Sequence, residues 1–194
     1  MRTSALDGRS QRSCASIDST SAATQDEAEI EAVVIDSVTR NEAVKCTEDL
    51  TQNFVEQSSA ATGKAAVEEC EEEATDESDD PDEVTVTEIA VEGSEATANA
   101  AFVGGPLDGQ AVEVALVEDG SGWKLDELVS FAAVDKEALA DAFEEQLAEG
   151  SGEFTPEQAK CFGDASRAAS GTQLEELVLH GSEEVAAELG EGCE

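Results

Sequence analysis

The sequence predicts an α+β protein in which N-terminal helices pack on a curved four-stranded antiparallel sheet, followed by a small helical C-terminal unit. Three observations predict this class. Hydrophobic residues recur with a helical period after residue 26, alternate with a period of two between residues 83 and 131, and return to the helical period from residue 132. We therefore expect a tether over residues 1–25, an α+β domain over 26–131 and a helical tail over 132–194.

The first 25 residues are rich in Ser, Thr and Ala and show no hydrophobic periodicity, which indicates a disordered tether. Cys14 and the "ASIDSTSAATQ" after it resemble the start of a mature bacterial lipoprotein, in which a lipidated cysteine precedes a small polar tether. The preceding "QRS" is not a lipobox, and the chain has no apolar run of signal-peptide or transmembrane length. Two expectations stay open: the recorded start is wrong or trimmed, or Cys14 is an unpaired thiol.

The next stretch predicts helices whose cysteines face inward. Residues 26–41 form an amphipathic helix with its apolar stripe at Ile30, Val33, Val34 and Val38. Cys46 recurs with Leu50 and Phe54 at every fourth residue, and Cys70 recurs with Val67 and Ala74. Both cysteines therefore lie on hydrophobic stripes.

Cysteine spacing favours disulfides over a metal or redox site. A zinc site and a thioredoxin-like motif both need close pairs such as C-x-x-C, which the chain lacks, and its one histidine is His180. A disulfide needs only facing cysteines, so we expect Cys46 to pair with Cys70, contributing about 3.5 kcal/mol in the chain-entropy model; two free buried thiols are the alternative. We expect Cys161 to pair with Cys193 and so tie the chain end to a helix. Two bridges imply an oxidising compartment outside the cytoplasmic membrane. We expect no metal and no cofactor.

Four strands follow an acidic linker at residues 71–83. The linker has no glycine for a calcium loop, so a hydrated connector is the default. The strands are expected in residues 83–93, 94–103, 110–120 and 122–131, joined by Gly-containing turns as an antiparallel meander. A slip in the alternation predicts a β-bulge near Thr87 and Glu88.

A family resemblance covers residues 26–131. The cysteine-containing helices, then "VTVTEIAVEGSEATANAAF" and "VEVALVEDGSGWKLDEL", resemble secreted actinobacterial members of the nuclear transport factor 2-like, cystatin-like superfamily. The resemblance implies a cone whose sheet wraps around a pocket. Superfamily members include isomerases, dehydratases, binding domains and exported proteins of unknown role. We expect Phe102, Leu116 and Trp123 as pocket-lining candidates; Trp123 either stacks on a ligand or, as the simpler interpretation, closes the core.

The sequence gives no catalytic residue. Enzymes of the superfamily use a pocket carboxylate or histidine, commonly with a tyrosine or a second acid; this chain has no tyrosine, and His180 lies outside the matching region. Carboxylates such as Asp36 or Glu88 remain, and each is expected to be a solvated surface acid.

The tail is expected to form a three-helix unit. Leu139, Phe143 and Leu147 lie on one stripe, and "TPEQ" predicts a helix start capped by Thr155 and Gln158. A second capping box is expected at Thr172 and Glu175, in a helix broken near Gly181, with His180 at a helix end or on the surface. So small a unit needs the Cys161–Cys193 bridge or packing against the first domain.

The chain carries 47 acidic and 10 basic residues, a net charge of −37. A field of this sign repels phosphates and anionic lipids, which excludes binding of either through a basic surface. The charge indicates a surface adapted to concentrated salt, hence a halophilic source; a surface that gathers cations or a basic partner is the alternative. A cytoplasmic DNA mimic is the third possibility, and the cysteines argue against it.

We therefore predict an extracytoplasmic binding or scaffolding protein of the cell envelope, secreted or tethered at the cell surface. Its expected partner is a small apolar ligand or an envelope protein, with no nucleic acid, and it contacts membrane only through a lipid anchor at Cys14. An isomerase or dehydratase that uses a pocket carboxylate is the alternative.

Overall fold

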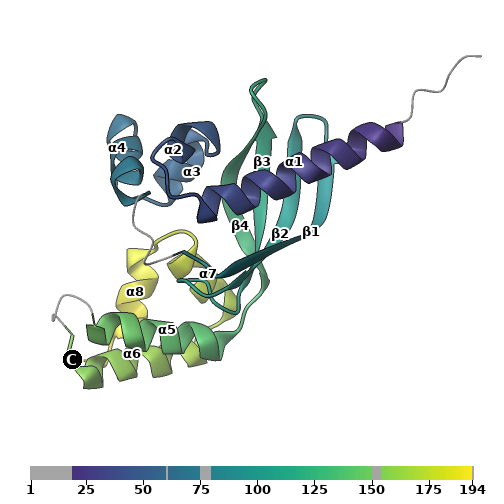
Figure 1. Ribbon diagram of the computed structural model, residues 1–194. Helices are drawn as coiled ribbons and strands as arrows, with labels where there is room; N and C mark the ends of the chain where they lie inside the picture. The colour runs from purple at the N-terminus through teal and green to yellow at the C-terminus, as the bar shows by residue number, and fades with distance from the viewer. Residues whose placement is uncertain (1–18, 60, 75–79, 150–153, 194) are drawn as a thin grey trace, which may run out of the picture.

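The computed structural model describes residues 19–59, 61–74, 80–149 and 154–193. Cys14 and residues 1–18 of the predicted tether lie outside this part. The protein has the predicted α+β fold, with helices before and after a four-stranded antiparallel sheet (Figure 1). Within the described residues, no helix combines the length and the apolar character that crossing a bilayer requires.

The N-terminal region contains α1 (Ser19–Thr39), α2 (Lys45–Glu48), α3 (Gln52–Gln57) and α4 (Lys64–Glu73). Residues 19–25, expected in the tether, form the first turns of α1. Ala22, Ala23 and Gln25 are good helix formers, so a helix nucleated by its packed half extends through this stretch without an apolar stripe. Thr51 starts α3, because its side chain accepts a hydrogen bond from the Phe54 backbone N–H at 3.2 Å.

The sheet consists of β1 (Glu83–Glu92), β2 (Glu95–Val103), β3 (Ala111–Glu118) and β4 (Trp123–Ala133), in that spatial order. Its antiparallel meander confirms the prediction from the turns. The bulge lies between Thr87 and Ala90 and includes Glu88, which has a φ of 54° and accepts a hydrogen bond from Asn99 Nδ2 at 2.7 Å. This confirms the predicted bulge.

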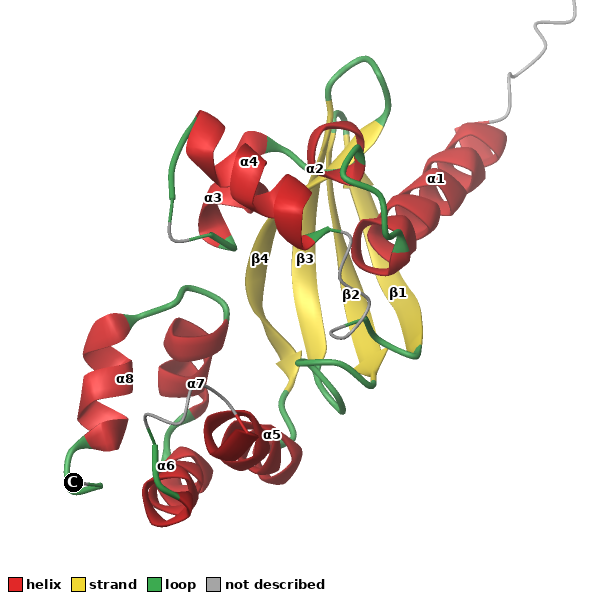
Figure 2. Ribbon diagram, turned by 60° about the vertical axis from the view of Figure 1, so that its left-hand side comes forward, coloured by secondary structure: helices red, strands yellow, loops and turns green. Residues whose placement is uncertain are grey.

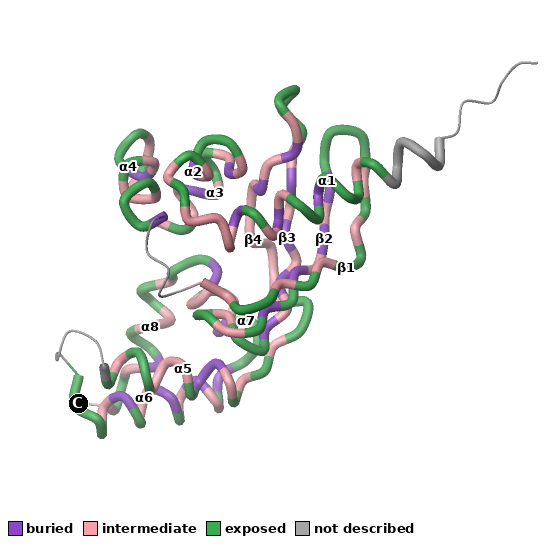
Figure 3. The backbone as a smooth tube through the Cα atoms, viewed as in Figure 1, coloured by how far each residue is buried: buried purple, intermediate pink, exposed green. Residues whose placement is uncertain are grey.

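Helix α1 crosses one face of the sheet (Figure 1, and in an oblique view in Figure 2). It contacts β1 and β4, the two edge strands, so the sheet curves around it. Buried positions alternate along β2 and β3 because successive side chains point to opposite faces (Figure 3). The core between helix and sheet includes Ile30, Val34, Val112, Val114, Leu116 and Leu125.

The outer edge of β4 is covered by the segment from Asp49 to Gln57. Leu50 forms a parallel bridge with Leu125: the Thr51 N–H donates to the Leu125 carbonyl at 2.9 Å, and the Leu125 N–H donates to the Asp49 carbonyl at 2.8 Å. The Gln57 side-chain amide then donates to the Leu128 carbonyl and accepts from the Leu128 N–H, both at 2.9 Å. These bonds satisfy edge groups that otherwise attract other strands.

Both predicted disulfides are present. Cys46–Cys70 joins α2 to α4, and Cys161–Cys193 joins α6 to the segment after α8. Two such bridges suggest an oxidising compartment.

Over its described residues, 132–149 and 154–193, the tail has four helices where three were expected: α5 (Lys136–Glu149), α6 (Pro156–Ala168), α7 (Gly171–Val178) and α8 (Glu183–Gly190). The break expected near Gly181 is complete, because Gly181 adopts a φ of 60° and Ser182 caps a new helix. The Thr155–Gln158 capping box is confirmed. The second box was predicted wrongly at Thr172 and Glu175.

The second capping box consists of Ser170 and Gln173. Ser170 has an extended backbone and accepts from the Gln173 N–H at 3.2 Å, so α7 starts before Thr172. Glu175 is thereby available to accept a hydrogen bond from the Phe131 N–H of β4 at 3.0 Å. This bond joins the tail to the sheet.

The tail shares the core of the first domain. Its own core contains Leu139, Ala169, Leu174 and Leu189, while Leu179, at the end of α7, belongs to the core under the sheet. The fully buried Gln110 accepts from the Asp135 N–H at 2.9 Å and donates to the Asp135 carbonyl at 3.1 Å, which fixes the start of α5. The two units therefore pack as neighbours through α7 and the β4 end of the sheet.

Candidate ligand-binding cavity

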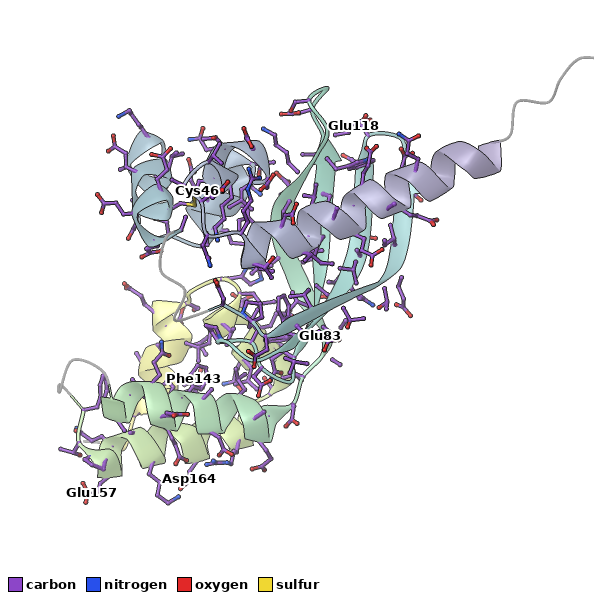
Figure 4. All side chains as sticks on the ribbon, in the orientation of Figure 1. Cys46, Glu83, Glu118, Phe143, Glu157 and Asp164 are labelled. Atoms are coloured by element: carbon purple, nitrogen blue, oxygen red, sulfur yellow. A yellow bond between two sulfur atoms is a disulfide. The ribbon has the colours of Figure 1, made fainter. Side chains whose placement is uncertain are left out.

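A cavity of about 660 Å³ lies between the helices α1–α4 and one end of the sheet. Its walls come from the last turn of α1, from α2, α3 and α4, from the end of β2 and from the β2–β3 loop. The Cys46–Cys70 bridge holds α2 and α4 together on the helical side (Figure 4), and Cys70 itself lines the cavity. Sequence segments that are far apart thus meet at one site.

Most of the cavity wall is apolar. The helical periods of α1 and α3 direct their apolar stripes toward the sheet, that of α4 directs its stripe toward α2 and α3, and the period of β2 directs one face toward the helices. The apolar lining includes Val38, Leu50, Phe54, Ala74, Phe102 and Leu107. Leu50 and Phe102 are buried, whereas Val38, Phe54 and Leu107 are half-buried.

Among the described residues that line this cavity, Lys45 is the one basic side chain. It is half-buried, and this burial lowers the pKa of Lys45, an effect that the carboxylates of Asp80 and Asp49 partly offset. Acidic residues Glu72, Glu73 and Asp80 lie along the wall beside it. The site is therefore an apolar cavity with a desolvated ammonium group and an acidic border.

The hydroxyl groups of the cavity wall already have partners inside the protein. Ser37 Oγ, which is buried, donates to the Val34 carbonyl at 2.8 Å, and Ser58 Oγ donates to the Phe54 carbonyl at 3.1 Å. Ser59 Oγ donates to the carboxylate of Glu69. The three hydroxyl groups are thus engaged within the protein.

Of the three residues expected to line a pocket, the structure places one there. Phe102 lines the cavity, whereas Leu116 and Trp123, which are 1% and 4% exposed, belong to the closed core. All three point to the same side of the sheet, but Trp123 pairs with Glu118 at the β3–β4 turn, at the opposite end from the β2–β3 loop. Alternation along a strand predicts which face of the sheet a side chain lies on. It does not predict at which end of the sheet a cavity forms.

The carboxylates named as possible bases lie elsewhere. Asp36 and Glu88 are exposed, and neither lines the cavity. His180 is exposed after α7, and its Nδ1 lies 3.3 Å from Gln57 Nε2. The structure does not bring these three residues into one site.

Sequence reasoning missed Lys45. Its signal is its position, since it precedes a bridged cysteine and is the only basic residue between Arg40 and Lys64. A search for metal ligands over the described residues finds no cluster of three or more His, Cys, Asp or Glu side chains that could hold an ion.

Comparison with known proteins finds no family model, no curated protein and no solved structure that matches this chain. The resemblance to the nuclear transport factor 2-like superfamily therefore stays a prediction based on the residues quoted above. The fold and the cavity are described from this structure alone.

Proposed function

We propose that the protein is an extracytoplasmic, salt-adapted binding protein of the cell envelope, and that it holds a small, mainly apolar ligand in the cavity between α1–α4 and the sheet. The observation that carries this proposal is the cavity itself, about 660 Å³ in volume and lined mainly by apolar side chains. Ligand sites in proteins have volumes of roughly 300–1,000 Å³ and few polar groups.

The chemistry of the cavity restricts the ligand. An apolar body gains from leaving water for contact with Val38, Phe54 and Phe102. An oxygen atom on the ligand, such as a carbonyl or hydroxyl, would accept a hydrogen bond from Lys45 Nζ. The acidic border and the net charge of −37 disfavour ligands that carry several negative charges.

Two observations support the proposed location. The two disulfides suggest an oxidising compartment, and the segment around Cys14 resembles a lipoprotein start. A thioether-linked lipid at Cys14 would tether the domain to the membrane. A secreted form without a lipid is the alternative.

Filling the cavity tests the proposal. Nile red, a neutral apolar dye, should bind the native protein saturably with a rise in fluorescence. The substitution Val38→Phe adds volume where α1 lines the cavity, so the dye should bind about tenfold or more weakly, a change that corresponds to about 1.4 kcal/mol.

The matched control is Val33→Phe. Val33 lies on the same helix and packs against the same core, but it does not line the cavity. This variant should keep the dye affinity of the native protein even if both variants unfold at a lower temperature. Equal loss of binding in both variants, or no saturable binding by the native protein, contradicts the proposed function.

A further inference from the structure

A second hollow lies at the junction of the sheet domain and the tail. This junction groove, of about 690 Å³, is formed by the β2–β3 loop, β4, α5, and α7 with the residue that follows it. Its wall includes Leu128, Phe143, Leu177 and Val178, all of which remain partly exposed. Phe143 is labelled in Figure 4, on the side of α5 that faces α7 and the sheet.

The tail around the groove is strongly acidic. Residues 132–194 contain 16 acidic and 3 basic residues. All three basic side chains have partners within the tail: Lys136 Nζ donates to the Ala169 carbonyl, Lys160 pairs with Asp164 at 2.8 Å, and Arg167 pairs with four carboxylates. Exposed Glu145 lines the groove itself.

Charge therefore decides which occupant the groove fits. A second copy of this chain would bring another −37 charge to the same surface, and nucleic acid or anionic lipid would be repelled in the same way. A segment that carries both apolar and basic side chains would bury the first against Leu128 and Leu177 and place the second near Glu145. Such charge complementarity also speeds association.

We propose that the junction groove binds a short segment of a partner protein that combines Leu- or Phe-type side chains with Lys or Arg. The junction groove opens beside the tail and the ligand cavity beside α1–α4. Partner and ligand therefore bind at different places, although Pro106 and Leu107 of the β2–β3 loop contribute to both walls.

Three fluorescent peptides test the proposal by anisotropy at an ionic strength of about 0.15 M, where charges more than about 8 Å apart are screened. One is an amphipathic Leu/Lys helix, one has the same composition in an order that disperses the Leu residues, and one is a Leu/Glu helix. The native protein should bind the first most tightly, because only this peptide supplies an apolar face together with positive charge.

Two substitutions locate the binding site. Glu145→Lys reverses a charge on the groove wall without altering the core, and it should weaken binding of the Leu/Lys peptide about fivefold. Glu157→Lys is the same change at an exposed residue of α6 (labelled in Figure 4). It should change the affinity for the peptide less than about twofold. Leu177→Ser removes apolar contact and should also weaken the peptide, with thermal unfolding used to confirm that the variant is folded.

Several outcomes overturn the proposal. Equal affinity for the dispersed peptide, or equal effects of Glu145→Lys and Glu157→Lys, would show attraction to the whole surface and no site. A native dimer in sedimentation that Leu177→Ser converts to a monomer would make a second copy the occupant. Binding of a neutral dye in the groove with no peptide binding would make it a small-molecule site.

Discussion

A single turn residue, Asp119, illustrates how local hydrogen bonds set acid stability. Its Oδ1 accepts hydrogen bonds from the hydroxyl and, at 3.0 Å, from the backbone N–H of Ser121, and its Oδ2 lies 3.1 Å from Lys124 Nζ. These three contacts, in that order of importance, lower the pKa of Asp119 from 3.8 to about 2. They close the turn between β3 and β4.

The substitution Asp119→Asn should therefore destabilise the protein in a pH-dependent way. Because the pKa is lower in the folded chain, the ionised form stabilises the fold fully above the ordinary value of 3.8 and progressively less as the pH falls toward about 2. Unfolding midpoints of the native protein and the variant should differ at pH 6 and converge through this window. A difference that stays constant from pH 6 to pH 2 would rule out this role.

At the scale of elements, α5 and α6 pack closely because α6 has no side chain at Gly163. A Cβ atom at Gly163 would lie 2.4 Å from Glu144 Cγ, which belongs to α5. Glu144 is held in place by an ion pair with Arg167 at 2.7 Å. The glycine thus leaves room on α6 for the Glu144 side chain of α5.

We expect Gly163→Ala to lower stability by about 1–3 kcal/mol, the usual cost of overpacking, although Ala favours a helix interior by about 1 kcal/mol. The matched substitution is Gly171→Ala, because a Cβ atom there meets nothing within 4 Å and the backbone is helical. This second variant should be as stable as the native protein or more so. Thermal unfolding compares them, and equal effects would exclude the packing explanation.

The sequence predicts elements well where one periodicity dominates. The strands follow from strict alternation, and the bulge at Glu88 from a slip in it. The inward helical periods of Cys46 and Cys70 predicted their bridge. The start of α1 was missed because helix propagation leaves no hydrophobic signal, and the cap at Ser170 was missed because Thr172 and Glu175 offered the same local chemistry two residues later.

At the scale of the whole molecule, two arginines each pair with several of the carboxylates that give the protein its negative charge. Arg167 of α6 pairs with Glu137, Asp141 and Glu144 of α5 and with Asp164 of its own helix. Its hydrogen bonds to Glu144 and Asp141 raise the pKa of Arg167 most. Arg40 similarly pairs with Glu42, Glu48 and Asp49, close to where the chain begins to cover the edge of β4. Each arginine offsets repulsion among its neighbours.

The native protein should unfold at a higher temperature as salt rises from low to molar concentration, because repulsion across a net charge of −37 is screened. Arg167→Gln should lower the midpoint most at low salt, with the difference shrinking as salt replaces the lost cation. Lys160→Gln, which breaks one exposed pair, is the control and should have a smaller effect. No gain in stability with salt would contradict the proposed salt adaptation.

The candidate site was less predictable than the fold. Periodicity indicates which face of an element is buried, and Phe102 lies on the buried face of β2. The cavity itself depends on how α1, α4 and the β2–β3 loop meet, which no local pattern encodes. The position of Lys45 in the cavity wall could not be predicted either, because its burial comes from tertiary packing and not from its neighbours in sequence.

Neither disulfide joins the sheet domain to the tail. One joins α2 to α4, and the other joins α6 to the C-terminal segment. What joins the halves is reversible, namely the anchoring of Leu179 beneath the sheet and the polar bonds of Glu175 and Gln110. After a protease nicks the connector near Val134, denaturant without reductant should therefore separate two fragments, each with its own disulfide loop intact.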